Sequence, residues 1–194
     1  SQITANIAAT VSKGGYWQDT DQPAPQGKVI FLSAEDDPAD TIKPRLIAAG
    51  ADLKQCHVLQ AIHYQDEEGE NKSRTFDLRQ DINRLETAIK KMTDVKLIII
   101  DPISAYLGKT DSHNNADMRG LLTPLAAMAA TYDIAIVLLT HLNKSIGQDA
   151  IGRVIGSVGL IAAARAGYIV SKDPESPETR YFIPIKNNIG NDKD

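Results

Sequence analysis

Three unbroken runs of apolar residues, at 29–32, 97–100 and 134–139, constrain the fold of this 194-residue chain most strongly. A strand that is apolar along its whole length must be covered on both faces of its sheet. Between the runs lie segments with helical spacing of apolar residues, of which 76–92 is the clearest. The alternation predicts an α/β fold, a mostly parallel sheet with helices on both faces.

The two ends of the chain extend this pattern. Residues 3–11 place apolar side chains on one helical face, and Gly14-Gly15 predicts where that helix stops. Residues 57–62 are typical of a further strand, whereas 65–74 is charged and poor in apolar residues, which predicts a mobile surface loop. At the other end, the strand-like runs 168–173 and 180–186 flank a turn-rich segment and predict an antiparallel edge hairpin. No repeat or linker divides the sequence, so we expect one domain.

Composition narrows the classes of function. The net charge is −4, which excludes a basic field over the whole chain and leaves nucleic-acid contact to local lysines and arginines. Cys56 is the only cysteine, so an internal disulfide and a cysteine-rich zinc site are excluded. The apolar runs are shorter than the ~20 residues that a membrane span requires. We therefore expect a cytoplasmic protein without a membrane partner.

Acidic residues directly follow two of the apolar runs. Asp101 ends the run at 97–100, where a hard oxygen ligand for nucleotide-bound Mg²⁺ would stand, although it could merely cap the loop before Pro102. Glu35 follows the run at 29–32 and could orient and deprotonate a water that attacks a γ-phosphate. For Asp37, before Pro38, we favour capping of the next helix.

The third apolar run ends in Thr140 and His141. Polar side chains at this position can sense a γ-phosphate and transmit its loss to the following loop. A single histidine is more often structural, so His141 gains significance only from the residues around it.

Together these segments resemble the RecA-like P-loop ATPases of the RepA-type hexameric replicative helicase group, which are often described as AAA-family ATPases. The resemblance covers essentially the whole chain. It is carried by the segments SAEDDPADTIKPRLIAAGAD, KLIIIDPISAYLG, VLLTHLNK, RVIGSVGLIAAARAGYIV and PIKNN. It implies a RecA-like core over 1–194 that uses ATP and Mg²⁺, and a ring, most simply a hexamer, that acts on single-stranded DNA.

The resemblance also implies roles for individual residues. Ser1 would be the hydroxyl residue of the Walker A motif, where it and Asp101 hold Mg²⁺, and Glu35 would be the catalytic glutamate. The other implied positions are Gln2, Thr140 and His141 at the nucleotide, and Arg165 and Lys186 reaching a neighbouring subunit's nucleotide. Lys144 and Arg153, in the glycine-containing loop 143–153, are the candidates for DNA contact. A solvated loop is the alternative, and we favour contact because glycine-rich loops in this region couple the nucleotide state to movement.

The glycines and lysine of the Walker A motif would come just before Ser1. A P loop binds phosphate through consecutive backbone amides and that lysine, so we expect 1–194 alone to lack the first strand and most of the P loop, to bind ATP weakly and to be inactive. For the intact protein we expect an ATP-driven motor in DNA replication, mobile-element maintenance or recombination. The alternatives are an ATP-switched regulator or helicase loader without unwinding activity, and a remnant that never had a P loop.

Overall fold

The computed structural model describes residues 1–66, 68–110, 114–141 and 157–190. Their contacts form two compact units. The first comprises 1–109 with 124–140, and the second the described residues of 110–123 and 141–194. Helix α4 (Asn115–Tyr132) contributes residues to both units.

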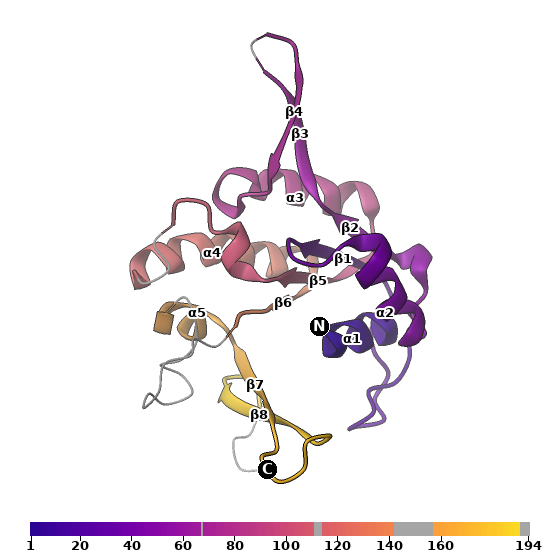
Figure 1. The fold of residues 1–194 in the computed structure, drawn as a ribbon. Coiled ribbons are helices and arrows are strands. Elements are labelled where there is room, and N and C mark those ends of the chain that lie inside the picture. Colours follow the sequence, from indigo (N-terminus) through magenta and orange to yellow (C-terminus); the bar gives the residue numbers. More distant parts are fainter. Residues whose placement is uncertain (67, 111–113, 142–156, 191–194) are drawn as a thin grey trace. The chain divides into compact units, whose positions relative to one another are not determined.

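A four-stranded parallel sheet is the centre of the first unit (Figure 1). Its strand order is β2-β1-β5-β6, formed by Cys56–Leu59, Lys28–Ser33, Val95–Asp101 and Ala135–Leu138. The two inner strands, β1 and β5, carry two of the three apolar runs, and their central residues are almost completely buried. The predicted parallel α/β sheet is confirmed.

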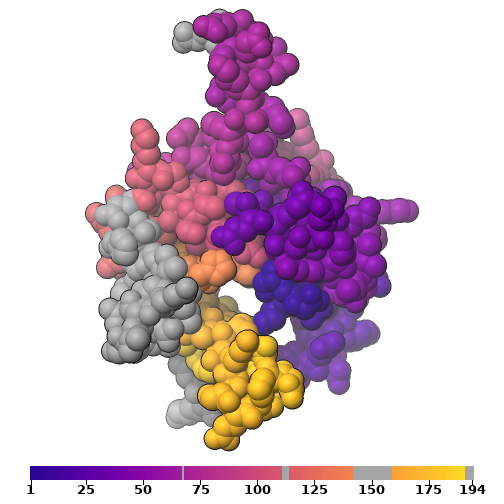
Figure 2. All heavy atoms as spheres, in the orientation of Figure 1, coloured from indigo at the N-terminus to yellow at the C-terminus, as the bar shows by residue number. Residues whose placement is uncertain are grey.

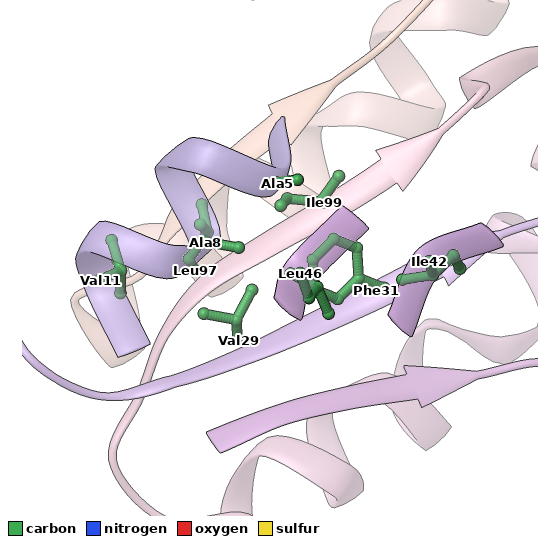
Figure 3. Close-up of a cluster of buried hydrophobic side chains, with 9 residues drawn as sticks. All are labelled: Ala5, Ala8, Val11, Val29, Phe31, Ile42, Leu46, Leu97 and Ile99. Carbon is green, nitrogen blue, oxygen red and sulfur yellow. The ribbon is translucent and has the colours of Figure 1, made fainter. Parts of the chain in front are cut away.

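One face of this sheet is covered by α1 (Gln2–Lys13) and α2 (Lys43–Ala48). Small residues of α1 allow the helix to approach the strands closely, and α2 contributes larger side chains. The core of this face is the cluster drawn in Figure 3, which consists of Ala5, Ala8, Val11, Val29, Phe31, Ile42, Leu46, Leu97 and Ile99. Gly14 ends α1 as predicted, because its φ of 64° is a left-handed conformation that glycine adopts without strain.

Helix α3 (Leu78–Met92) lies over the opposite face (Figure 1). Its side chains Leu78, Leu85 and Ile89 are buried, as the spacing of apolar residues predicts. Asp77 caps its first turn by accepting backbone N–H groups. Alternate residues of the inner strands point to this side and are fully buried, namely Ile30, Leu32, Ile98 and Ile100.

The charged segment 65–74 is not the loop that its composition indicates. Residues Asn71–Thr75 form β4, which pairs with β3 (Ala61–Gln65) in an antiparallel hairpin whose tip projects from the first unit (Figure 2). At the turn, the Asp66 carboxylate accepts two backbone N–H groups and pairs with Lys72. Because most of the hairpin's side chains are exposed, a strand can form here without an apolar pattern.

Two other boundaries differ from the sequence-based ones. The single strand expected over 57–62 is divided at Gln60 into β2 and β3. The helix expected from Asp37 begins as a π-helical turn, η1 (Pro38–Ile42), before α2. Asp37 caps this turn, as predicted, by accepting the backbone N–H groups of the second and third residues after it at 2.7 and 2.9 Å. Two short 3₁₀ turns, η2 (Leu53–Gln55) and η3 (Ile103–Tyr106), complete the first unit.

The second unit contains α5 (Ser157–Ala163) and an antiparallel pair formed by β7 (Ala166–Lys172) and β8 (Arg180–Asn187). The pair confirms the predicted C-terminal hairpin, and the rings of Tyr168 and Phe182 stack across it with centroids 4.4 Å apart. Among the helices that the structure describes, none is both long and apolar enough to cross a membrane.

Candidate functional site

The carboxyl ends of β1 and β5 lie at the same level of the sheet. Parallel pairing places Ser33 directly opposite Asp101, and the Ala34 backbone N–H donates to the Asp101 carbonyl at 3.2 Å. Ligands bind at this edge of an open parallel sheet. The strands therefore bring Asp101 and the Ser33–Asp37 segment together, as the sequence pattern predicts.

The start of α1 reaches the same edge. The terminal ammonium of Ser1 lies 3.2 Å from Asp101 Oδ2, and the Ser1 carbonyl is held by the Thr4 hydroxyl at 2.8 Å. The first backbone N–H groups of a helix have no partner within the helix and attract anions. A phosphate at the start of α1 would therefore lie beside the Asp101 carboxylate.

A narrow cleft of about 20 Å³, the Ser1 cleft, joins these groups. Its polar lining consists of Ser1, Thr4, Ser33, Asp36, Arg45 and Asp101. The Arg45 guanidinium donates to Asp36 Oδ2 at 2.6 Å. The cleft thus combines a helix N-terminus, a carboxylate suited to Mg²⁺ and a guanidinium suited to phosphate oxygens.

Glu35 lines a second and larger hollow of about 360 Å³, the Glu35 cavity. The cavity adjoins the Ser1 cleft, because Ser33 and Asp36 line both spaces. Its remaining lining comes from the 34–38 loop, Gln60, Thr75 and Tyr106. The structure therefore places Asp36 in the Ser1 cleft and Glu35 next to it.

The residues that follow β6 continue the carboxyl edge of the sheet, where the site lies. Leu138 pairs with Ile100, and the Leu139 N–H donates to the Ile100 carbonyl at 2.9 Å. Thr140 comes directly after Leu139 and is half-buried. His141 is exposed and belongs to the second unit, so its role at the nucleotide stays a prediction.

The two cations assigned to a neighbouring subunit's nucleotide lie in the second unit. The Lys186 ammonium donates to the carbonyls of Ile161 and Ala162, at 2.9 and 2.8 Å, and so caps the end of α5. The Arg165 side chain is exposed, while its carbonyl accepts the Asn188 N–H at 2.8 Å. Their action on a neighbouring nucleotide stays a prediction.

The three remaining predicted positions contribute no contact to the site that the structure describes. Gln2 is exposed in the first turn of α1. Lys144 and Arg153, the candidates for DNA contact, lie outside the residues that the structure describes.

Two residues that the sequence analysis did not single out line these spaces. Arg45 follows Asp36 by nine residues, and the π-helical turn brings its side chain back to that carboxylate. Tyr106 follows Asp101 by five residues and enters the Glu35 cavity from η3. An arginine within the helix after an acidic loop is a signal that could have indicated Arg45. Tyr106 has no such signal, because an aromatic residue in an apolar segment indicates only core packing.

The donor set at the Ser1 cleft fits a nucleotide-bound Mg²⁺. This ion usually retains several waters and takes only one or two protein carboxylates, the remaining ligands coming from phosphate. Asp101 and the Ser1 hydroxyl meet that requirement, and among the described residues no group of three metal-binding side chains competes for the ion.

A helix that starts at the carboxyl edge of a parallel sheet, beside an aspartate that ends a buried strand, is the arrangement of a P-loop NTPase core. The chain belongs to the AAA domain family, which matches residues 1–147. A comparison with curated proteins finds none that matches. The matched range includes the Ser1 cleft, the Glu35 cavity and the β3–β4 hairpin.

Proposed function

We propose that this protein is an ATP-hydrolysing motor of the RepA-type helicase kind, which acts in DNA replication, mobile-element maintenance or recombination. The observation that carries the proposal is that Ser1, at the start of α1, and Asp101, at the end of β5, line the same cleft. Family membership supports ATP as the ligand. The resemblance of 33–52 to the corresponding helicase segment supports the narrower class.

In this proposal the N-terminus of α1 binds the β- and γ-phosphates of ATP. The Ser1 hydroxyl and Asp101 would hold Mg²⁺, which neutralises charge on the phosphate oxygens when it is bound. Arg45 stands in the same cleft and can exchange its Asp36 partner for a phosphate oxygen, because guanidinium groups pair with both anions in the same geometry.

Glu35 would orient the attacking water and accept its proton, while Thr140 and His141 would sense the γ-phosphate. Arg165 and Lys186 would contribute to catalysis from a neighbouring subunit of a ring, most simply a hexamer. Lys186 would then have to leave the α5 carbonyls that it caps. Lys144 and Arg153 would contact single-stranded DNA in the channel of the ring.

The decisive experiment measures ATP binding and turnover in the full-length protein and its variants. Glu35→Gln should retain ATP binding and lose about 10²–10⁴-fold in turnover, the range for loss of a general base. Glu68→Gln, on the exposed β3–β4 hairpin, is the matched control and should hydrolyse ATP at the wild-type rate. Unchanged turnover in Glu35→Gln would refute the assignment.

Two further measurements separate a motor from its alternative. DNA-stimulated ATPase activity together with strand displacement supports the motor, whereas ATP binding that changes assembly without strand displacement supports a loader or regulator. Light scattering with and without ATP tests the ring. The whole proposal would be refuted if the wild-type protein neither bound nor hydrolysed ATP.

A further inference from the structure

The β7–β8 hairpin and the residues just after it carry most of the large hydrophobic side chains that the fold leaves exposed. Of the ten such side chains among the residues that the structure describes, six lie between Tyr168 and Ile189. Apolar side chains that are exposed singly are normal in proteins, whereas a contiguous group of them marks an interaction site. All six belong to the second unit, so the group lies within one compact part of the chain.

Strand pairing divides the side chains of the hairpin between its two faces. Residues paired across the strands project to the same face, and alternate residues of one strand share a face. One face, here called the aromatic–basic face, therefore consists of three cross-strand pairs, which are Tyr168 with Pro184, Val170 with Phe182, and Lys172 with Arg180.

Two aromatic rings form the apolar part of the aromatic–basic face. Tyr168 and Phe182 lie nearly parallel, with an angle of 8° between the ring planes and centroids 4.4 Å apart. The stack covers one side of each ring, yet Tyr168 is still 50% and Phe182 55% exposed. A planar base can extend such a stack, and base–aromatic stacking accepts every base because each has a π-face.

Two cations form the other part of this face. Lys172 and Arg180 are directly opposite each other, and both side chains are exposed. Like charges in directly opposite positions destabilise a strand pair. Among the described residues neither cation has a carboxylate partner, and the Arg180 guanidinium donates to the backbone carbonyls of Pro177 and Thr179. A phosphate bound by both cations would offset the repulsion between them.

The opposite face of the hairpin has different chemistry. It contains Ser171, Tyr181 and Ile183, and Asp173 adds a carboxylate that accepts the Tyr181 hydroxyl at 2.6 Å. This hydrogen bond holds the pKa of the Asp173 carboxyl below its usual value, so the group is charged at neutral pH and repels phosphate. Only the aromatic–basic face therefore combines exposed rings with cations that lack a carboxylate partner among the described residues.

We propose that the aromatic–basic face binds single-stranded DNA. Bases stack on the two rings, and phosphates pair with the two cations. The inference rests on the proposed function for the choice of DNA as the partner, and it adds a site outside the predicted DNA-binding loop. Alternate side chains of one strand are about 7 Å apart, so Phe182 and Arg180 can contact the base and the phosphate of one nucleotide. Rings combined with cations bind a single strand without regard to its sequence.

Fluorescence anisotropy with labelled oligo(dT) and the full-length protein tests the stacking. Phe182→Ala should weaken binding at least about fivefold, the lower limit for the loss of one base–aromatic stack. Phe182→Tyr keeps the ring and should bind as the wild type does. Tyr181→Ala removes a similarly exposed ring from the opposite face, so it is the matched control and should retain the wild-type affinity.

Lys172→Glu tests the charges and separates binding from folding. A glutamate opposite Arg180 replaces repulsion with attraction, so the variant should melt at the wild-type temperature or above it. Its affinity for oligo(dT) should nevertheless fall. The slope of log K against log salt concentration should become shallower by about 0.7 or more, because each phosphate contact on a single strand contributes about 0.7. Lys54→Glu, at an exposed lysine of the first unit, is the control and should leave the slope unchanged.

Wild-type affinity in either Phe182→Ala or Lys172→Glu would overturn the inference and leave the proposed motor intact. An equal loss in Tyr181→Ala would also overturn it, because the hairpin would then act through its fold and not through one face. Wild-type affinity together with a smaller assembly of Phe182→Ala in light scattering would assign the face to a second copy of the chain. If the wild type binds no oligo(dT) with or without ATP, the inference and the DNA role of the proposed function fail together. ATP turnover measured without DNA still tests the rest of that function.

Discussion

Two aspartate–arginine pairs in the first unit have the same closest distance, 2.6 Å, and very different surroundings. At the base of the β3–β4 hairpin, Asp81 is 2% exposed, accepts both Arg74 nitrogens at 2.6 and 2.7 Å, and also accepts the Asp77 N–H at 2.9 Å. In the Ser1 cleft, Asp36 is 29% exposed and accepts one Arg45 nitrogen.

The difference shows that distance alone does not say what an ion pair does. Every oxygen of the buried Asp81 carboxylate has a partner, and the Arg74 hydrogen bond holds the pKa of that carboxyl below its usual value. This pair joins the hairpin to α3 and has no capacity for a ligand. Both side chains of the Asp36–Arg45 pair are partly exposed, so we expect an arriving phosphate to replace the carboxylate at little cost.

The largest effect that tests this comparison is on stability. Asp81→Ala should lower the free energy of unfolding by about 3 kcal/mol, because it removes the partners of a buried hydrogen-bond network. Asp36→Ala should change it by less than about 1 kcal/mol. Urea denaturation of the 194-residue chain, followed by the fluorescence of its single tryptophan, Trp17, measures both.

Equal losses in these two variants would contradict the distinction between a structural pair and an exchangeable one. The Arg84 guanidinium, 3.5 Å from Asp81, provides a control within the same network. Its side chain is mostly exposed and its contact with Asp81 is longer than that of Arg74, so Arg84→Ala should have little effect on stability.

The same contrast explains how far the sequence predicted the structure. A buried strand can be recognised in the sequence, because residues such as 97–100 must be apolar throughout. An acidic residue at the end of such a run, here Asp101, then stands out from its neighbours. The β3–β4 hairpin cannot be recognised in this way, because both of its faces are largely solvated and its strands are held by pairing and by the contact of Arg74 with α3. Composition correctly predicts exposure there and wrongly predicts a loop.

The site was predictable only where a local motif marks it. Asp101 and the 33–37 loop follow strands, and parallel pairing alone brings them together. Arg45 reaches the cleft through a π-helical turn that no simple periodicity indicates. Tyr106 has the pattern of a core residue, and no local signal indicates that it lines a cavity with residues of distant segments, the Glu35 loop and Thr75 among them.

The next effect in size concerns the nucleotide. Arg45→Ala should weaken ATP binding about tenfold in the protein from the complete gene, because the Ser1 cleft loses a phosphate-pairing group and retains the Asp36 charge. Calorimetric titration with ATP and Mg²⁺ measures the change. Arg79→Ala, an exposed arginine on α3, is the matched control and should bind ATP as the wild type does.

The Asp36 variant provides the opposing result. Asp36→Ala frees the Arg45 guanidinium from its carboxylate and removes a negative charge from the cleft, so ATP affinity should stay the same or rise. A loss of affinity as large as that of Arg45→Ala would mean that the pair acts as a unit to shape the cleft. The exchange of Asp36 for phosphate would then be wrong.

The smallest expected effect is the response of the two pairs to salt. Raising the salt concentration from 0.1 to 1 M shortens the screening length from about 10 to about 3 Å, which weakens exposed charge pairs more than buried ones. In double-mutant cycles at both concentrations, the Asp36–Arg45 coupling should fall by a few tenths of a kcal/mol toward zero. The Asp81–Arg74 coupling should keep most of its value, because the low accessibility of Asp81 excludes ions from the contact.

Parallel decreases in the two couplings would show that both carboxylates are equally accessible to solvent, against the difference in burial on which the comparison depends.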